Sequence, residues 1–246
     1  MGDADVPRDV PGLMLRINEV YDRPTVQGEG PHVGRLCTFV RLWGCNLHCR
    51  WCDTPYTWDT TGRNGTVFPR SEQSRSMAVS AVVEAVAALH VPVCVVSGGE
   101  PMLQEGAVLD LARQLRGYEV ETHVETNGTR PPPEHDDEVA HWSVSPKLPT
   151  AEAGTHALSY GVLRAWAQHP RAIFKVVCSN PDEVNAASHL FDMLRVPQHA
   201  RWIMPEGITA EAVTGSLHAV VDAALAHQLN ITPRLHVQLW GATRGR

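Results

Sequence analysis

Short apolar runs alternate with segments of helical periodicity along most of this chain. The strand-like runs are 13–20, 36–42, 91–96, 119–125, 142–144, 172–178, 201–204 and 234–239. Between several of them, apolar residues recur every three or four positions, as in Val79, Val82, Val83 and Val86, which is the spacing of one helix face. This alternation predicts an α/β fold, a mainly parallel sheet with helices outside it.

Local signals refine this prediction. Asn180, followed by Pro181 and two acidic residues, is typical of a helix start, with the asparagine as N-cap. The polar stretch 60–76 is rich in Gly, Ser and Arg, and we expect a surface loop of variable order. The run of three prolines at 131–133 is expected to form another surface connection.

Length and charge limit the class of protein. A chain of 246 residues fits one large domain or two small ones, and we expect a single domain over 13–246 after a flexible tail at 1–12. The net charge of -6 gives no strong footprint for nucleic acid. No stretch approaches 18 apolar residues, and the first residues are polar. We therefore expect no membrane span and no signal peptide.

Three cysteines lie within eight residues in the pattern C-x3-C-x2-C, at Cys45, Cys49 and Cys52. Thiolates are soft ligands that select iron–sulfur clusters, zinc or cuprous copper. A four-iron cluster usually takes four cysteines, so three local ones indicate a cluster with one iron open to another ligand. Six cysteines without a secretion signal fit a reducing cytoplasm, where clustered cysteines indicate metal or redox sites.

Two other interpretations of these cysteines stay open at this point. A disulfide with one free cysteine would strain so short a loop. A structural zinc site would need a fourth ligand, and His48 lies inside the loop, although no second ligand pair is visible. The remaining cysteines, Cys37, Cys94 and Cys178, lie in strand-like runs and are expected to pack in the core.

Polar motifs follow several of the predicted strands. They are Ser97-Gly98-Gly99-Glu100-Pro101, Glu125-Thr126-Asn127-Gly128, Ser145-Pro146-Lys147 and, after the first strand, Gln27-Gly28-Glu29-Gly30. Parallel α/β folds place their sites at the carboxyl ends of the strands. Each motif alone also fits an ordinary turn or a solvated surface charge, so none is diagnostic by itself.

Together with the cysteine loop, these motifs resemble the radical S-adenosylmethionine superfamily and, within it, the 7-carboxy-7-deazaguanine synthases. The residues that carry the resemblance also include Phe39-Val40-Arg41-Leu42-Trp43-Gly44 and Cys52-Asp53-Thr54, and it extends from about Leu13 to the C-terminus. The resemblance implies a partial, modified (β/α)6 TIM-like barrel. It makes the zinc interpretation much the weaker one.

The resemblance also implies an activity and its cofactors. Cys45, Cys49 and Cys52 would hold a [4Fe–4S] cluster whose open iron chelates S-adenosyl-L-methionine, and one electron would release a 5′-deoxyadenosyl radical. The radical would abstract hydrogen from C6 of 6-carboxy-5,6,7,8-tetrahydropterin. Ring contraction and loss of ammonia would then give 7-carboxy-7-deazaguanine, the precursor of queuosine. Mg2+ is the third implied cofactor.

The roles that the resemblance implies are assigned residue by residue. Thr54 would bind Mg2+, and His48 would be a bystander. Contacts to S-adenosyl-L-methionine are expected from Trp51, Cys52, Asp53, Gly99, Glu100, Glu125, Asn127, Ser145, Pro146 and Lys147. Contacts to the pterin are expected from Val26, Gln27, Gly28, Glu29, Arg41 and Ser97. Arg41 would pair with the substrate carboxylate through two parallel hydrogen bonds.

The implied partners are the small pterin substrate and a reductase or flavodoxin as electron donor. The resemblance further implies a homodimer. From the cysteines, the charge and the hydropathy we expect a cytoplasmic protein without nucleic-acid or membrane contact. A radical enzyme that acts on a glycine of a protein partner and a non-enzymatic zinc module are the alternatives. The C-terminal residues 237–246 either close over the substrate or pack. The segment 60–76 lies where the superfamily barrel would have its first helix, and we expect that element to be remodelled.

Overall fold

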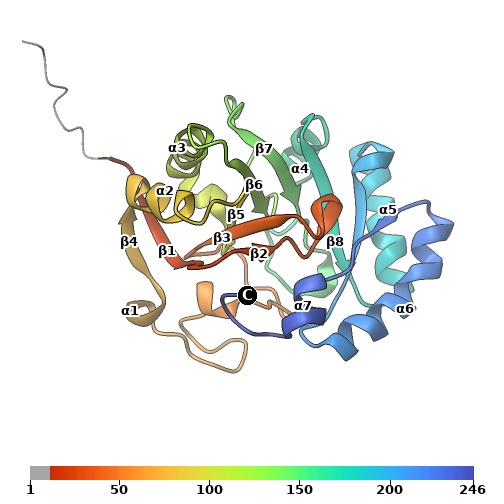
Figure 1. Cartoon of the computed structure of the whole chain (residues 1–246). Helices are drawn as coiled ribbons and strands as arrows, with labels where there is room; N and C mark the ends of the chain where they lie inside the picture. The colour runs from red at the N-terminus through yellow and green to blue at the C-terminus, as the bar shows by residue number, and fades with distance from the viewer. Residues whose placement is uncertain (1–11) are drawn as a thin grey trace, which may run out of the picture.

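The strands of the described part of the chain form one curved, open sheet. The computed structural model describes residues 12–246, and their sheet has the order β10-β9-β8-β7-β6-β5-β3-β1-β4, with β2 paired to β3 beside this path (Figure 1). The strands are β1 (Met14–Val20), β2 (Thr25–Val26), β3 (Leu36–Leu42), β4 (Arg75–Ala78), β5 (Val93–Gly98), β6 (Glu121–Thr126), β7 (Val139–Val144), β8 (Ala172–Cys178), β9 (Arg201–Pro205) and β10 (Asn230–Ile231).

The sheet is parallel from β3 through β5 to β10, whereas β1, β2 and β4 pair antiparallel. Its two edges, β4 and β10, do not pair with each other. Six consecutive parallel strands, β3 and β5 to β9, with the two-residue β10 added as a seventh at the edge of an open, curved sheet, confirm the prediction of a partial (β/α)6 barrel.

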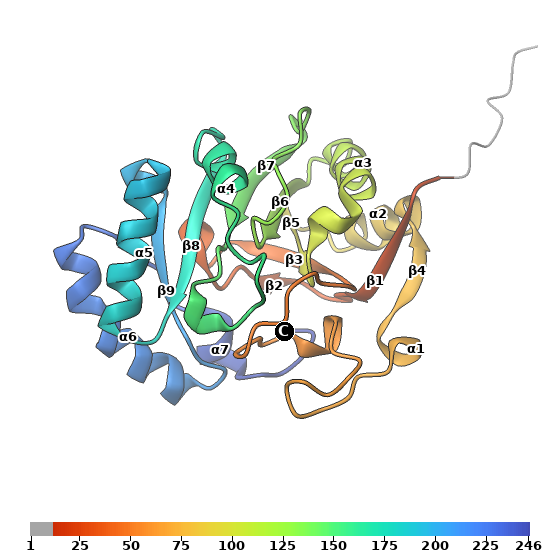
Figure 2. The same ribbon diagram turned by 180° about the vertical axis from the view of Figure 1, so that it is seen from behind.

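Most of the helices cover the outer side of the sheet. The helices of the described residues are α1 (Arg70–Gln73), α2 (Val79–Ala87), α3 (Glu105–Arg116), α4 (Tyr160–Ala167), α5 (Pro181–Leu194), α6 (Ala210–Ala226) and α7 (Leu235–Trp240), with short 3-10 turns η1 (Gly30–His32), η2 (Pro55–Thr57), η3 (Pro101–Gln104), η4 (Pro149–Ala151) and η5 (Gln198–Ala200). Figures 1 and 2 show α2 to α6 along the outside, while β2 and α7 lie within the curve.

The two faces of each parallel strand bury different side chains, because successive residues point to opposite sides. In β5, Cys94 and Val96 belong to the main core beneath the helices, whereas Val93 and Val95 pack with Cys37 on the inner face. The predictions that Cys37, Cys94 and Cys178 are core residues are confirmed, since all three are fully buried. The predicted cap of α5 is confirmed as well, because the side chain of Asn180 accepts a hydrogen bond from the backbone N–H of Glu183.

Two predictions about secondary structure were wrong. The segment 234–239 forms the N-cap and most of the helix α7 (Leu235–Trp240) instead of a strand, and the last strand is the short β10 at Asn230–Ile231. The alternating apolar residues of that segment do not share one buried face, because Val237 is buried while Leu239 is 54% exposed. Segment 60–76 is not only a loop, since it contains α1 and the start of β4, whose Met77 pairs with Leu15 of β1. The predicted tail at 1–12 lies, except for Gly12, outside the described residues.

Candidate active site

The cysteine loop leaves the end of β3 and is anchored at several points. The backbone N–H of Gly44 donates to Thr57 (2.7 Å), and those of His48 and Arg50 donate to Ala153 (3.2 Å) and Ala151 (2.8 Å) beside η4. The last two bonds hold the loop against the segment that follows β7. Backbone contacts therefore define the shape of the loop.

The three thiols of this loop are free and half-buried or buried, and those of Cys45 and Cys52 lie close to N–H donors. The N–H of Leu47 lies 3.4 Å from Cys45 Sγ, and Trp58 Nε1 lies 3.3 Å from Cys52 Sγ. All six cysteines of the chain are free thiols, so the disulfide interpretation does not hold in this structure. Burial raises the pKa of all three thiols, for Cys45 to about 12, and metal binding would displace their protons.

The donor set fits an iron–sulfur cluster. Within residues 12–246, no three His, Cys, Asp or Glu side chains surround one point where a single metal ion would sit. A cubane cluster does not require the three thiolates to converge on one point, because each thiolate binds its own iron. Hydrogen bonds to the sulfurs, such as those from Leu47 and Trp58, are among the contacts that tune such clusters.

The glycine pair after β5 lets the cysteine loop approach closely. A Cβ on Gly99 would lie 2.0 Å from the carbonyl oxygen of Gly44, and one on Gly98, whose φ is +124°, would lie 2.4 Å from the backbone of Leu42. Two hydrogen bonds join the same segments, from the N–H of Gly99 to Leu42 (3.1 Å) and from that of Glu100 to Gly44 (2.8 Å). Only glycine fits between these backbones, so this turn fixes the start of the cysteine loop.

The carboxylate of Glu100 binds its own chain. It is fully buried and accepts hydrogen bonds from Thr126 Oγ1 (2.7 Å) and from the N–H groups of Asn127 (2.6 Å) and Met102 (2.9 Å). Burial raises the pKa of Glu100, while these donors oppose the rise. In this structure the side chain ties the end of β5 to the end of β6, which positions Asn127.

Asn127 reaches from β6 to the cysteine loop. Its amide nitrogen donates to Asn46 Oδ1 (2.9 Å) and lies 4.0 Å from Cys45 Sγ. Its amide oxygen accepts from the N–H and hydroxyl of Thr129. The predicted cofactor residue therefore lies beside the first cysteine.

The motif after β7 also lies next to the cysteine loop. Lys147 Nζ donates to Ser145 Oγ (2.7 Å) and lies 5.2 Å from the centre of the Trp51 ring, while Pro146 between them is buried. The charge of Lys147 partly offsets the burial that raises the pKa of Cys49. The structure thus brings together three of the predicted cofactor motifs at the carboxyl ends of β3, β6 and β7.

The Gln27–Gly30 segment occupies a different place from the one expected. It follows β2, which pairs antiparallel with the start of β3 through Val26 and Leu36, so it does not leave the carboxyl end of a parallel strand. Instead it crosses the inner face of the sheet. Gln27 Nε2 lies 3.4 Å from Glu125 Oε1, and the other oxygen of Glu125 accepts from Ser97 Oγ (2.9 Å).

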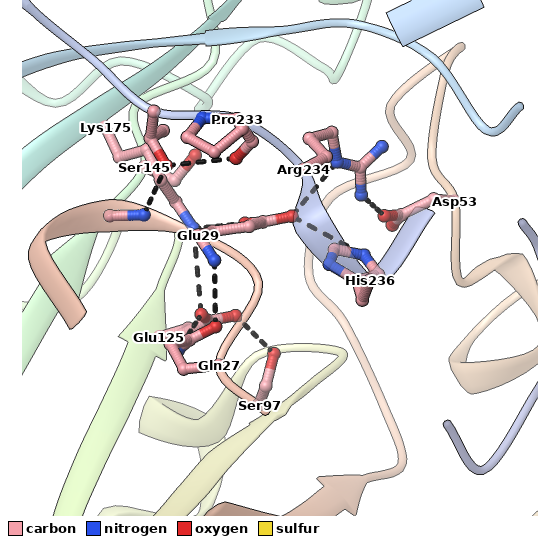
Figure 3. Close-up of polar contacts among 12 residues, drawn as sticks. Gln27, Glu29, Asp53, Ser97, Glu125, Ser145, Lys175, Pro233, Arg234 and His236 are labelled. Atoms are coloured by element: carbon pink, nitrogen blue, oxygen red, sulfur yellow. Dashed lines mark hydrogen bonds and ion pairs between the residues drawn. The ribbon is translucent and has the colours of Figure 1, made fainter. Parts of the chain in front are cut away.

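A buried ion network joins this segment to the rest of the site (Figure 3). Glu29 pairs with Lys175 of β8, with Arg234 Nε (3.0 Å) and, at 3.8 Å, with His236 Nε2. Burial would raise the pKa of Glu29, but Lys175, Arg234 and His236 together hold it well below its usual range. The carboxylate is therefore ionised at neutral pH.

The same network reaches the cysteine loop and the carboxylate of Glu125. Arg234 also pairs with Asp53, directly after Cys52, and Lys175 Nζ lies 3.6 Å from Glu125 Oε1. Sequence reasoning missed Lys175, Arg234 and His236. For Lys175 a signal existed, because a lysine in the middle of an apolar strand is rarely buried without a partner. Arg234 gave no such signal, because it is the first residue of the predicted segment 234–239 and does not interrupt an apolar run.

Gly28 is where the C-terminal helix rests on this segment. A Cβ there would lie 2.0 Å from His236 Nδ1, and the N–H of Leu235 donates to the carbonyl of Gly28 (2.9 Å). The N–H of Gly30 donates to Thr232 Oγ1 (2.6 Å). The C-terminal segment thus holds the Gln27–Gly30 segment in place.

Arg41 stands at the end of β3 with part of its guanidinium free. Its Nη2 donates to Tyr21 OH (3.2 Å), while its buried Nε has no partner among the described protein atoms. Burial would lower the pKa of Arg41, but Tyr56, Tyr21 and Asp53 hold it above its ordinary value. The group remains a cation with hydrogen-bond capacity to spare.

Thr54 and the C-terminal residue Arg244 both lie near the end of the cysteine loop. Thr54 Oγ1 is 3.8 Å from Cys52 Sγ, so its hydroxyl lies beside the cysteine loop. At the C-terminus, Arg244 stacks on the Tyr56 ring at 3.9 Å and donates to Asn18 Oδ1 (3.3 Å). The last residues therefore pack against β1 and η2 in this structure.

Comparison with known proteins agrees with this geometry. The family model of the radical SAM superfamily matches residues 43–145, which span the cysteine loop and the motifs after β5, β6 and β7. The fold is similar to the crystal structure of QueE from Escherichia coli, with a TM-score of 0.68 and 22% identity over 91% of this chain and 95% of that one. The fold and the site thus define a radical SAM protein, a class that implies a [4Fe–4S] cluster, S-adenosylmethionine and an electron donor.

Curated relatives identify the family within the radical SAM superfamily. The 7-carboxy-7-deazaguanine synthase of Pyrobaculum aerophilum is 35% identical over 94% of this chain and 97% of its own length. That of Halobacterium salinarum is 33% identical over 93% of this chain and 91% of its own length. The chain belongs to the 7-carboxy-7-deazaguanine synthase family. No helix within residues 12–246 is long and apolar enough to cross a membrane.

Proposed function

We propose that this chain is a ring-contracting lyase that converts 6-carboxy-5,6,7,8-tetrahydropterin into 7-carboxy-7-deazaguanine with loss of ammonia. The product would enter 7-deazapurine biosynthesis, including that of queuosine. The observation that carries the proposal is 35% identity to a synthase along almost the whole of both chains. The cysteine loop, the glycine turn and Lys147 support it, because they meet at one edge of the sheet.

Cys45, Cys49 and Cys52 would hold the cluster. When bound, the cluster and S-adenosyl-L-methionine supply one-electron chemistry that abstracts hydrogen from the substrate. The protein binds, orients and shields the reacting groups. Trp51, Cys52, Asp53, Gly99, Glu100, Glu125, Asn127, Ser145, Pro146 and Lys147 are the residues that we assign to S-adenosyl-L-methionine.

Arg41 would bind the substrate carboxylate. Its guanidinium is cationic and has an unpartnered buried nitrogen, and arginine binds carboxylates through paired hydrogen bonds. On the inner face of the sheet, Ser97 and the segment Val26, Gln27, Gly28 and Glu29 would orient the pterin ring. Because Arg234 bonds both Glu29 and Asp53, it would keep the pterin-side segment in register with the cysteine loop.

We also propose Mg2+ at Thr54. Mg2+ requires near-octahedral oxygen ligation and keeps several waters, so one hydroxyl would hold it only with substrate oxygens in the same shell. The chain would act as a single domain over 13–246, as a cytoplasmic homodimer, and would accept its electron from flavodoxin or a reductase. These assignments rest on the family.

The test is anaerobic reconstitution followed by assay of 6-carboxy-5,6,7,8-tetrahydropterin conversion by mass spectrometry. We expect the deazaguanine product, and none from the Cys45→Ala variant. Reductive cleavage of S-adenosyl-L-methionine without pterin conversion would overturn the proposed substrate and point to another radical reaction, such as hydrogen abstraction from a glycine of a protein. Stoichiometric zinc in place of iron in active protein would overturn the class of cofactor.

A further inference from the structure

A small cavity lies behind the Gln27–Glu29 segment. The volume of the cavity is about 10 Å3, which is close to the minimum that holds one water molecule. On one side it is lined by Gln27, Glu29 and Glu125 of the candidate active site, which Figure 3 shows. On the other side it is lined by His123, Ser143 and three further residues of η1 and β7, namely Pro31, His32 and His141.

Two buried polar atoms of the wall lack a partner among the described protein atoms. They are His123 Nδ1 and Ser143 Oγ, and their residues are only 2% and 6% exposed. An unsatisfied buried polar group costs roughly 1–3 kcal/mol, so such atoms in native proteins normally bind a water molecule or a ligand. The cavity has the size and the polarity for one such molecule.

The chemistry of His123 defines what that molecule must do. His123 Nε2 lies 3.3 Å from Glu121 Oε2, and an ionised carboxylate can only accept. Nε2 therefore carries the ring proton, and Nδ1 is an acceptor that needs a donor. Burial and the neighbouring His32 lower the pKa of His123 to about 4, so the ring is neutral at neutral pH.

The surrounding imidazoles support this neutral state. The ring centres of His32, His123 and His141 are 4.5, 4.6 and 5.3 Å apart. Several positive charges at such distances would repel one another. The wall therefore offers a neutral acceptor at His123 and, at Ser143, a hydroxyl that both accepts and donates.

We propose that this cavity binds one small neutral molecule that donates hydrogen bonds, either water or ammonia. This molecule donates to His123 Nδ1 and contacts Ser143 Oγ. For ammonia the inference rests on the proposed function, because that reaction releases ammonia. On one side the cavity adjoins Gln27 and Glu29, which we assign to the pterin, and Glu125, which we assign to S-adenosyl-L-methionine. On the other side it adjoins Pro31, an exposed residue of η1. Ammonia released from the pterin ring would bind in this cavity before it leaves the protein.

The first measurement is a high-resolution crystal structure of the reconstituted protein and of its Ser143→Ala variant. We expect one isolated density peak within hydrogen-bond distance of both His123 Nδ1 and Ser143 Oγ in the parent protein, and its loss or displacement in the variant. Thr122→Val is the matched control, since it removes a buried hydroxyl, also unpartnered among the described atoms, from the opposite face of β6. An empty cavity in the parent protein would overturn the proposal.

The second measurement separates the two occupants. Turnover is followed during titration with ammonium chloride at constant pH and ionic strength, with trimethylammonium chloride as a cation too large for the cavity. If ammonia binds, Ser143→Ala should raise the ammonium inhibition constant roughly two- to tenfold, the effect of one hydrogen bond, and Thr122→Val should not. Equal inhibition of all three proteins would exclude ammonia and leave water as the ligand.

The two measurements test the proposed function and the cavity ligand independently. A protein that does not convert the pterin would refute the proposed function, while the crystallographic result would still decide whether the cavity holds a ligand. A His123→Phe variant repeats the density test with the acceptor removed instead of the hydroxyl. A peak that persists unchanged in both variants would show that neither atom binds it and would overturn the assignment.

Discussion

Glu29 and Arg234 form a buried ion pair, with 3.0 Å between Oε1 and Nε, although 205 residues separate them in the sequence. Their side chains are only 10% and 6% exposed. Because Arg234 also pairs with Asp53, this one contact joins the segment after β2, the start of α7 and the cysteine loop. The candidate active site therefore depends on the two ends of the chain meeting correctly.

Glu29→Gln should strongly destabilise the protein. The change keeps the volume of the side chain but leaves Lys175 and Arg234 with less compensation, and breaking a buried ion pair costs roughly 3–5 kcal/mol. We expect a loss of that size in the free energy of unfolding measured in urea. Glu84→Gln, at an exposed position in α2, is the control and should change it by less than about 0.5 kcal/mol. Equal values for the two variants would contradict the assigned role of the network.

The contribution of Glu29 should also depend on pH. Its pKa is below the usual 4.5 in the folded protein, so the unfolded chain takes up this proton first when the pH falls. The stability that Glu29 contributes is thus complete above about pH 5 and is lost as the pH falls below 4.5 towards the folded pKa. Urea unfolding of the parent protein and of Glu29→Gln between pH 3 and 7 should show a difference that shrinks on acidification. A difference that grows in acid would give the wrong sign.

Gly99→Ala should impair cluster assembly. The new Cβ would lie 2.0 Å from the carbonyl oxygen of Gly44, so the start of the cysteine loop would have to move. We expect less than half of the parent iron content after reconstitution. Gly106→Ala in α3 meets no atom within 4 Å; it should leave the iron content unchanged and stabilise the helix by up to about 1 kcal/mol. Full iron content in Gly99→Ala would show that the loop tolerates the displacement.

The cysteines should divide into two classes. Cys49→Ala removes a thiol of the loop, whereas Cys94→Ala changes a fully buried core residue of β5. We expect about four irons and four sulfides per chain in the parent protein and in Cys94→Ala, with broad absorbance near 400 nm as an expected signature, and loss of the cluster in Cys49→Ala. Iron and sulfide analysis decides this, and loss of the cluster in Cys94→Ala would refute its assignment to the core.

Thr54→Ala should retain the cluster but lose turnover. Its hydroxyl lies beside the cysteine loop without being one of the thiols, and even ~1 Å of substrate misplacement can cost roughly 100-fold in rate. The measurement is steady-state turnover across a Mg2+ titration, together with iron content. Thr60→Ala, at an exposed position in the next turn, serves as control. Parent turnover and unchanged Mg2+ dependence in Thr54→Ala would show that the metal role does not apply to this chain.

Much of the fold followed from local patterns. The apolar runs of β3, β5 and β8 and the capped start of α5 are properties of short segments, so the sequence predicted them. The exception is the segment from Arg234 to Leu239, where alternating apolar residues indicated a strand. It is the helix α7, because β10 already forms the edge of the sheet and the segment buries Val237 while Leu239 stays exposed, so it has no strand-like buried face.

For the site, the sequence by itself determined the three thiols, the glycine turn and Lys147, because each motif is local and follows its own strand. Only the tertiary structure decided that Glu100 faces inward, that Gln27 and Glu29 cross the inner face of the sheet, and that Lys175 and Arg234 meet Glu29. A buried charge can be recognised in a sequence, but its partner cannot. The partner is chosen by which strands lie side by side, and that depends on how the whole sheet and its two ends pack.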